Sequence, residues 1–91
     1  MKFYSTPSFT RYFGKLDPQQ KANVKEAINK LINAYTFEPL PAGLGLKKLR
    51  QNLWEIRVSL GGRILFSILG DKVSFILVGS HDDIRKYLKN L

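Results

Sequence analysis

Two arginines, Arg57 and Arg63, are the side chains of this chain best suited to phosphate chemistry. A guanidinium group stays charged and offers two parallel N–H donors to two phosphate oxygens. Both lie within residues 53–68, where apolar residues alternate with polar ones as on the two faces of a β-strand. We expect them on the face opposite the apolar one. Such a basic face indicates phosphate binding, and it does not separate binding from cleavage.

His81 and Tyr87 are candidate proton-transfer groups. His81 is the only histidine, and imidazole exchanges protons near neutral pH. It follows a predicted strand end beside a glycine, where a general acid or base could stand. The alternative is a structural residue at the start of the C-terminal helix. Tyr87 could stack on a nucleobase or assist proton transfer, or it could pack against the core with Ile84 and Leu88.

Glu55 stands two positions before Arg57, and two roles remain open for it. It could act as a general base, or it could balance the charge of the arginines. Arg57 could share a phosphate with Arg63 or form a salt bridge with a carboxylate. A run of charge is usually a solvated face. Five further basic residues are nevertheless candidates for contacts with a phosphate backbone: Lys47, Lys48, Arg50, Lys86 and Lys89.

The composition favours a polyanionic partner. Fifteen lysines and arginines stand against seven acidic residues, which leaves a formal net charge of +8. Nucleic acid, an anionic membrane face or an acidic protein would suit this charge, unless it only keeps the chain in solution. The chain has no cysteine, only one histidine and no glycine fingerprint for nucleotides, so we expect no metal and no cofactor. No apolar run is long enough to span a bilayer, and the N-terminus does not resemble a signal peptide. We therefore expect a cytoplasmic protein.

The N-terminal half reads as one strand and two helices. Residues 2–5 alternate as a short strand. Thr6-Pro7 is typical of an N-cap followed by proline at the first helical position, and it predicts a helix to about Gly14. Asp17-Pro18 repeats this signal before a longer helix. The apolar residues of that helix recur at helical spacing: Val24, Ile28, Leu31, Ile32 and Tyr35. Residues 37–45, with Pro39 and Pro41, are expected to form the connection that follows.

The C-terminal half reads as an antiparallel meander followed by a short helix from about His81. Strands are predicted near residues 46–49, 52–59, 63–69 and 72–79. Gly70-Asp71 favours a two-residue hairpin that starts with glycine. The whole chain, residues 1–91, is therefore expected to be a single α+β domain in which an N-terminal strand and two helices pack on an antiparallel β-meander.

Strand register decides where the arginines lie. A two-residue loop at Gly61-Gly62 would split the apolar residues of the two flanking strands between opposite faces. A three-residue loop pairs Ser59 with Arg63 and collects those residues on one face, so we expect this register, with a glycine in the left-handed conformation. It also places Arg57 and Arg63 beside Glu55 on the other face, here called the reverse face.

The strand after Gly70-Asp71 is expected to alternate in the same way. Val73, Phe75 and Leu77 are predicted on the core face beneath the two helices. The apolar residues predicted on the reverse face are Leu65, Leu69, Ile76 and Val78. Such a mixed surface is rarely left bare, so we expect the C-terminal segment or a partner to cover part of it.

Residues 56–66, Ile-Arg-Val-Ser-Leu-Gly-Gly-Arg-Ile-Leu-Phe, resemble a pattern of the RelE/ParE toxin superfamily. In that pattern a basic residue is followed by a glycine-containing turn and then by arginine, aliphatic residues and an aromatic one. Residues 78–83, Val-Gly-Ser-His-Asp-Asp, resemble the family's last strand end, where a catalytic Arg or His follows. Tyr87 matches its catalytic tyrosine, and Leu53-Trp54 is similar to YoeB-like members. The resemblance covers nearly the whole chain in element order, with short motifs.

The resemblance implies a RelE-like microbial RNase fold and the toxin of a type II toxin–antitoxin system. RelE-type members cut mRNA on the ribosome by metal-free attack of the 2′-hydroxyl, and Arg57, Arg63, His81 and Tyr87 would form the nuclease set. RelE has lysine at the position of Glu55, which leaves the base open. ParE-type members poison DNA gyrase instead, and a catalytically inert binding domain is a further alternative. The implied partners are the ribosome, mRNA and an acidic antitoxin helix in a hetero-oligomer.

Overall fold

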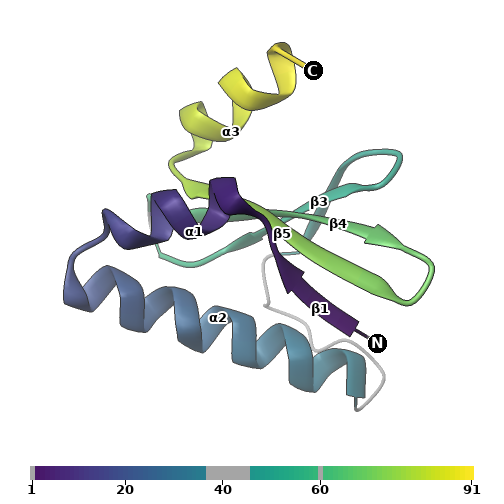
Figure 1. Ribbon diagram of the computed structural model, residues 1–91, viewed down its shortest axis with the longest axis horizontal. Helices are drawn as coiled ribbons and strands as arrows, with labels where there is room; N and C mark the ends of the chain where they lie inside the picture. The colour runs from purple at the N-terminus through teal and green to yellow at the C-terminus, as the bar shows by residue number, and fades with distance from the viewer. Residues whose placement is uncertain (1, 37–45, 60) are drawn as a thin grey trace.

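The computed structural model describes residues 2–36, 46–59 and 61–91 and has a single five-stranded sheet among them, in the order β1-β5-β4-β3-β2 (Figure 1). The strands β2 to β5 form the predicted antiparallel meander, and β1 adds to β5 in parallel. The α+β prediction is therefore confirmed, with a mixed sheet. The elements are β1 (Lys2–Ser5), α1 (Pro7–Gly14), α2 (Pro18–Thr36), β2 (Lys47–Arg50), β3 (Leu53–Arg57), β4 (Arg63–Leu69), β5 (Lys72–Gly79) and α3 (His81–Lys89).

Both N-terminal helices begin as predicted. The Thr6 Oγ1 accepts a hydrogen bond from the Phe9 amide at 3.2 Å and caps α1. At α2 the Asp17 carboxylate accepts from the Gln20 amide at 2.7 Å, while the Gln20 side-chain oxygen accepts from the Asp17 amide at 3.1 Å. This reciprocal pair satisfies donors that a helix start otherwise leaves unpaired. The predicted connection 37–45, with Pro39 and Pro41, and the side chain of Tyr35 lie outside the described residues.

Two hydrophobic cores lie on opposite sides of the sheet, and Figure 1 shows α2 and α3 on these opposite sides. The first core fills the space between the sheet and the helices α1 and α2. The second lies under α3, so the expectation that the C-terminal segment covers part of the reverse face is confirmed. The buried residues of the first core are Phe9, Val24, Ala27, Leu31, Ile56, Ile64, Phe66, Val73, Phe75 and Val78. Those of the second are Leu65, Leu77 and Ile84.

The register between β3 and β4 differs from the predicted one. Arg63 pairs with Arg57 rather than with Ser59, and neither Gly61 nor Gly62 has a positive φ. Beyond this pair the Gly62 carbonyl accepts the Val58 amide at 2.9 Å, which closes the turn. The shift is two residues, and side chains alternate with a period of two, so the face of every residue is preserved. Leu60, in this turn, lies outside the described residues.

The hairpin between β4 and β5 forms as predicted. Leu69 pairs with Lys72 across a two-residue loop, and Gly70 has φ of +60°. A positive φ at the first of two loop residues is disfavoured for residues with a Cβ atom and is readily adopted by glycine.

A β-bulge in β5 corrects the predicted alternation. Leu65 pairs with Leu77 whereas Phe66 pairs with Phe75, so Ile76 is an extra residue. Beyond it the two faces exchange. Leu77, predicted beneath the two helices, packs under α3, and Val78, predicted on the reverse face, is buried in the first core.

Candidate functional site

Arg57 and Arg63 face each other directly across β3 and β4. Directly paired residues project from the same side of a sheet with Cβ atoms about 5 Å apart, and like charges in this arrangement repel. Within the described residues the only ion pair joins Glu26 and Lys30 on α2, so neither arginine is neutralised by a neighbouring carboxylate. The expectation that both arginines share the reverse face is confirmed. An unneutralised pair of this kind is suited to binding an anion.

The two arginines differ in how they are held. The Arg63 Nη1 donates to the Ser59 carbonyl at 3.2 Å and to the Gly62 carbonyl at 3.0 Å. The Nη1 of this guanidinium therefore stabilises the turn through two hydrogen bonds. Its other nitrogens have no partner among the described residues. Arg57 is exposed, and its side chain makes no hydrogen bond among the described residues. Arg63 is thus oriented in advance, and Arg57 is free to move onto a ligand.

Glu55 lies two residues from Arg57 on the same face and is only 5% exposed. It pairs across the sheet with Lys47 on β2 and with Leu65 on β4. It makes no ion pair with either arginine, so the predicted salt-bridge alternative does not occur in the described part of the chain. No described side-chain oxygen is fully buried without a partner, so the Glu55 carboxylate still reaches water. A carboxylate held in this way could accept a proton.

His81 lies at the end of the sheet that carries the arginines. Gly79 pairs with Arg63, so Arg57, Arg63 and Gly79 form one row across three strands, and His81 follows two residues later as the first residue of α3. A Cβ atom on Gly79 would stand 2.7 Å from the Asp83 Oδ2, so glycine allows the first turn of α3 to approach the strand closely. The His81 side chain is exposed.

Ser80, not His81, caps α3. The Ser80 hydroxyl accepts from the Asp83 amide at 3.1 Å, and the Asp83 carboxylate accepts from the Ser80 amide at 2.9 Å. Hydrogen bonds from the Ser80 backbone and hydroxyl lower the pKa of Asp83, because they stabilise the charged carboxylate. His81 is therefore the first residue of α3, as the structural alternative expected, but it does not cap the helix. Its exposed imidazole could take part in proton transfer.

Tyr87 is separated from His81. Six residues of helix place it about 9 Å further along α3, and it packs against the second core beside Leu88. It also lines a cleft of about 330 Å³ between α1 and α3, with Arg11 and Tyr12 among its neighbours. The packing alternative stated for Tyr87 is thus what the structure shows.

The five predicted backbone contacts separate into two groups. Lys47 pairs with Glu55, whereas the Lys48 ammonium lies 5.6 Å from the centre of the Trp54 ring on the other face. The remaining three line an open cleft of about 540 Å³ between α3 and β2, here called the basic cleft. Its residues are Arg50, Asp82, Arg85, Lys86, Leu88 and Lys89. Arg85 was missed, although its spacing from Lys89 on a helix signalled a shared face.

No protein-family model matches this sequence, and no curated protein matches it. Solved structures do. The RelE–RelB toxin–antitoxin complex from Methanococcus jannaschii superposes with a TM-score of 0.71 and 21% identity, over 96% of this chain and 98% of that one. The DinJ–YafQ complex from E. coli gives 0.71 and 16%, over 91% and 96%. The YoeB/ParE toxin from Agrobacterium tumefaciens gives 0.65 and 26%, over 89% and 99%.

The chain has the RelE/ParE toxin fold. The fold resemblance inferred from the sequence is therefore confirmed. In the described part of this RelE-like chain, no group of three or more acidic or histidine side chains could hold a metal ion. Nor does any helix there have the length and apolarity needed to cross a membrane.

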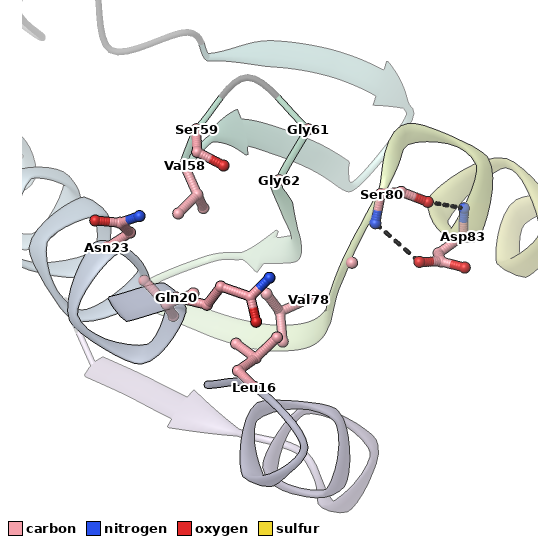
Figure 2. Close-up of a pocket in the computed structure, with 12 residues that line it drawn as sticks. Leu16, Gln20, Asn23, Val58, Ser59, Gly61, Gly62, Val78, Ser80 and Asp83 are labelled. Atoms are coloured by element: carbon pink, nitrogen blue, oxygen red, sulfur yellow. Dashed lines mark hydrogen bonds between the residues drawn. The ribbon is translucent and has the colours of Figure 1, made fainter. Parts of the chain in front are cut away.

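Sequence reasoning also missed a third cleft in the described part of this RelE-like fold, shown in Figure 2. It opens between the start of α2, the turn after β3 and the junction of β5 with α3, and its volume is about 450 Å³. We call it the turn cleft. Its polar residues include Gln20 and Asn23. Helical spacing marked these two residues only as a polar face of α2, and no local pattern indicated that the turn would lie opposite them.

Proposed function

We propose that this protein is the toxin of a type II toxin–antitoxin system and a metal-free endoribonuclease that cuts mRNA on the ribosome. The observation that carries the proposal is the directly paired, unneutralised Arg57 and Arg63. The likeness to structures of toxins, two of them in complexes with antitoxins, supports the toxin role.

The proposed reaction is an internal transfer within the RNA. The 2′-oxygen attacks the adjacent phosphorus, the bond from phosphorus to the 5′-oxygen breaks, and a 2′,3′-cyclic phosphate and a free 5′-hydroxyl result. Arg57 and the unbound nitrogens of Arg63 would stabilise the extra negative charge on the phosphate. Glu55 would accept the proton of the 2′-hydroxyl, and His81 would donate one to the leaving 5′-oxygen. Tyr87, set apart from these groups, would act by holding α3 in place.

The remaining basic residues would hold the RNA rather than react with it. Arg50, Lys86 and Lys89 share the basic cleft, where they would contact backbone phosphates, and Lys47 would extend this contact along β2. Lys48 is directed to the opposite face, so its contribution would be to a separate part of the ribosome or transcript. We place the protein in the cytoplasm, where ribosomes and transcripts are found.

An acidic antitoxin is the partner proposed to restrain this activity. The net charge of +8 would speed the encounter with an acidic segment, and apolar contacts would then hold the complex. A helix laid over the mixed apolar and basic reverse face fits both requirements.

The decisive variant is Arg57→Gln, because Arg57 makes no contact that supports the turn. We expect wild-type protein to cut messages in a translation reaction, and Arg57→Gln to cut at least a hundredfold more slowly, since it removes one donor from the charged transition state. Mapping of transcript 5′ ends measures the cuts. Lys25→Gln, which removes the same charge from the exposed side of α2, is the matched control and should cut normally. Intact messages at saturating wild-type protein would reject the proposal.

A ParE-like function is the second candidate. The separation of Tyr87 from His81 and the use of Arg63 in its own turn favour a protein that acts by binding. A gyrase supercoiling assay distinguishes the two functions: inhibition without RNA cutting would support the ParE-like function. Binding to RNA or protein with neither effect would identify an inert member of the fold.

A further inference from the structure

The turn cleft lies next to the arginine row but differs from it in chemistry. Gly79, the third member of the row, also lines the cleft, so the two sites meet at the end of β5. One wall of the cleft is apolar and is formed by Leu16, Val24, Val58 and Val78. Its volume of about 450 Å³ lies within the usual range for a small-molecule site. The nearby arginines would hold a phosphate, and the cleft would receive what is attached to it.

Gln20 presents hydrogen-bond donors to this cleft. Its side-chain oxygen accepts the Asp17 amide at 3.1 Å. A backbone N–H can only donate, so the amide orientation is set and both N–H groups of Nε2 remain for a ligand. Figure 2 shows the Gln20 side chain among the residues that line the cleft. Asn23, one turn later, has its oxygen bound to the Gln19 amide nitrogen at 3.0 Å and also keeps its donors.

Asp83, in the first turn of α3, supplies an acceptor to the same cleft. An aspartate carboxyl is charged at neutral pH, and the hydrogen bonds from Ser80 lower its pKa further. A fixed negative charge disfavours a phosphate in the cleft and accepts hydrogen bonds from N–H groups. The cleft therefore suits a flat, neutral group that has both a carbonyl oxygen and N–H donors.

Resting on the proposed function, we propose that the turn cleft binds one guanine base of the RNA, next to the phosphate held by the arginines. The edge of guanine carries O6 as an acceptor beside the N1 and N2 donors, so Gln20 would bind O6 and Asp83 would accept the N–H groups. Unstacked bases of single-stranded RNA are recognised along this edge. The apolar wall would cover one face of the ring. Gln20 is then a specificity-determining residue.

Gln20→Glu isolates this role. Glutamate keeps an oxygen for the Asp17 amide, so the start of α2 is retained, but it has no N–H to donate. Gln51→Glu is the matched control, because Gln51 is exposed in the turn between β2 and β3 and does not line the cleft. Unfolding in urea verifies that both variants are folded.

The first experiment measures binding without cleavage. Guanosine, adenosine, cytidine and uridine, which carry no phosphate, are titrated into the protein and followed by amide NMR. We expect guanosine to bind about tenfold more tightly than the others and to shift the signals of Gln20, Gly62 and Gly79. Gln20→Glu should remove this preference and Gln51→Glu should keep it. Equal binding of all four nucleosides, no binding, or an unchanged preference in Gln20→Glu would overturn the proposal.

The second experiment reads the same preference during cleavage. Transcript ends produced by wild-type protein should be enriched in guanine beside the cut, and Gln20→Glu should lose this enrichment while it still cuts. The two arms separate the proposals. Guanosine binding without any cutting would leave the cleft assignment standing and reject the nuclease. Cutting with no guanosine binding and no Gln20-dependent enrichment would reject the cleft assignment alone.

Discussion

At the scale of single residues, the two paired arginines differ in their contacts with the rest of the protein. Arg57 is exposed and uncommitted, whereas Arg63 donates to two carbonyls of the turn that borders the turn cleft. A substitution at Arg63 therefore changes phosphate binding and the shape of the turn together. Arg57 and Gln20 are consequently the better positions at which to separate cleavage from base recognition.

Arg63→Lys tests whether Arg63 stabilises the turn as well as being placed to bind phosphate. Lysine keeps the charge but lacks the planar fork, so it cannot hold both carbonyls and a phosphate. We expect the free energy of unfolding to fall by about 1 kcal/mol, the usual net value of such hydrogen bonds. Urea unfolding measures it, with Arg57→Lys as the control that should retain wild-type stability. Equal stability of the two variants would show that the contacts to the turn contribute nothing.

At the scale of elements, the junction of β5 with α3 positions the site. The Ser80–Asp83 capping box begins α3, and Gly79 allows its first turn to lie directly against the strand. His81 and the basic residues of α3 depend on this start. The β-bulge at Ile76 then turns Leu77 beneath α3, so the same strand holds the helix at a second point.

The stability of this junction should depend on pH. The pKa of Asp83 is lowered in the folded state, so its contribution is present above the ordinary carboxyl pKa and is lost as pH falls through the folded value. Asp83→Asn should therefore lower the free energy of unfolding at pH 7 by about 0.5 kcal/mol, a small value because the group is exposed. The difference should vanish near pH 2. Urea unfolding at both pH values checks this, and Asp82→Asn, beside the cap, should not show the same pH dependence.

At the scale of the whole molecule, the basic cleft is separate from the turn cleft, whose lining residues include no lysine or arginine. In the proposed function, the net charge of +8 would attract RNA, the basic cleft and the arginine row would bind phosphates, and the turn cleft would select a base. Electrostatic attraction of RNA and selection of a base would thus take place at different sites, since phosphate contacts carry no sequence information.

Binding to single-stranded RNA should weaken steeply with salt. Each phosphate contact releases a counterion and contributes about 0.7 to the slope of log affinity against log salt concentration. The triple variant Arg50→Gln, Lys86→Gln and Lys89→Gln should therefore reduce the slope by about 2. Fluorescence anisotropy measures it at several salt concentrations. A slope equal to that of wild type would show that the basic cleft does not contact RNA.

Local signals were sufficient for the elements and for most of the sheet faces. Thr6-Pro7, Asp17-Pro18 and Gly70-Asp71 act through neighbouring residues, so each correctly predicted a helix start or a hairpin. The error of two residues at the Arg63 pairing left the faces unchanged, because strand side chains alternate with a period of two.

Tertiary contacts decided the rest. The bulge that exchanges Leu77 and Val78 lies in β5, which is between β1 and β4 in the sheet and has a hydrophobic core on each face. No residue near the bulge signals an extra position. Pairing of β1 with β5 joins segments about 70 residues apart. Gln20 meets the turn and α3 only after the chain has folded, and the sequence by itself showed it as one more polar residue. Faces follow from local periodicity, whereas clefts depend on which distant segments come together.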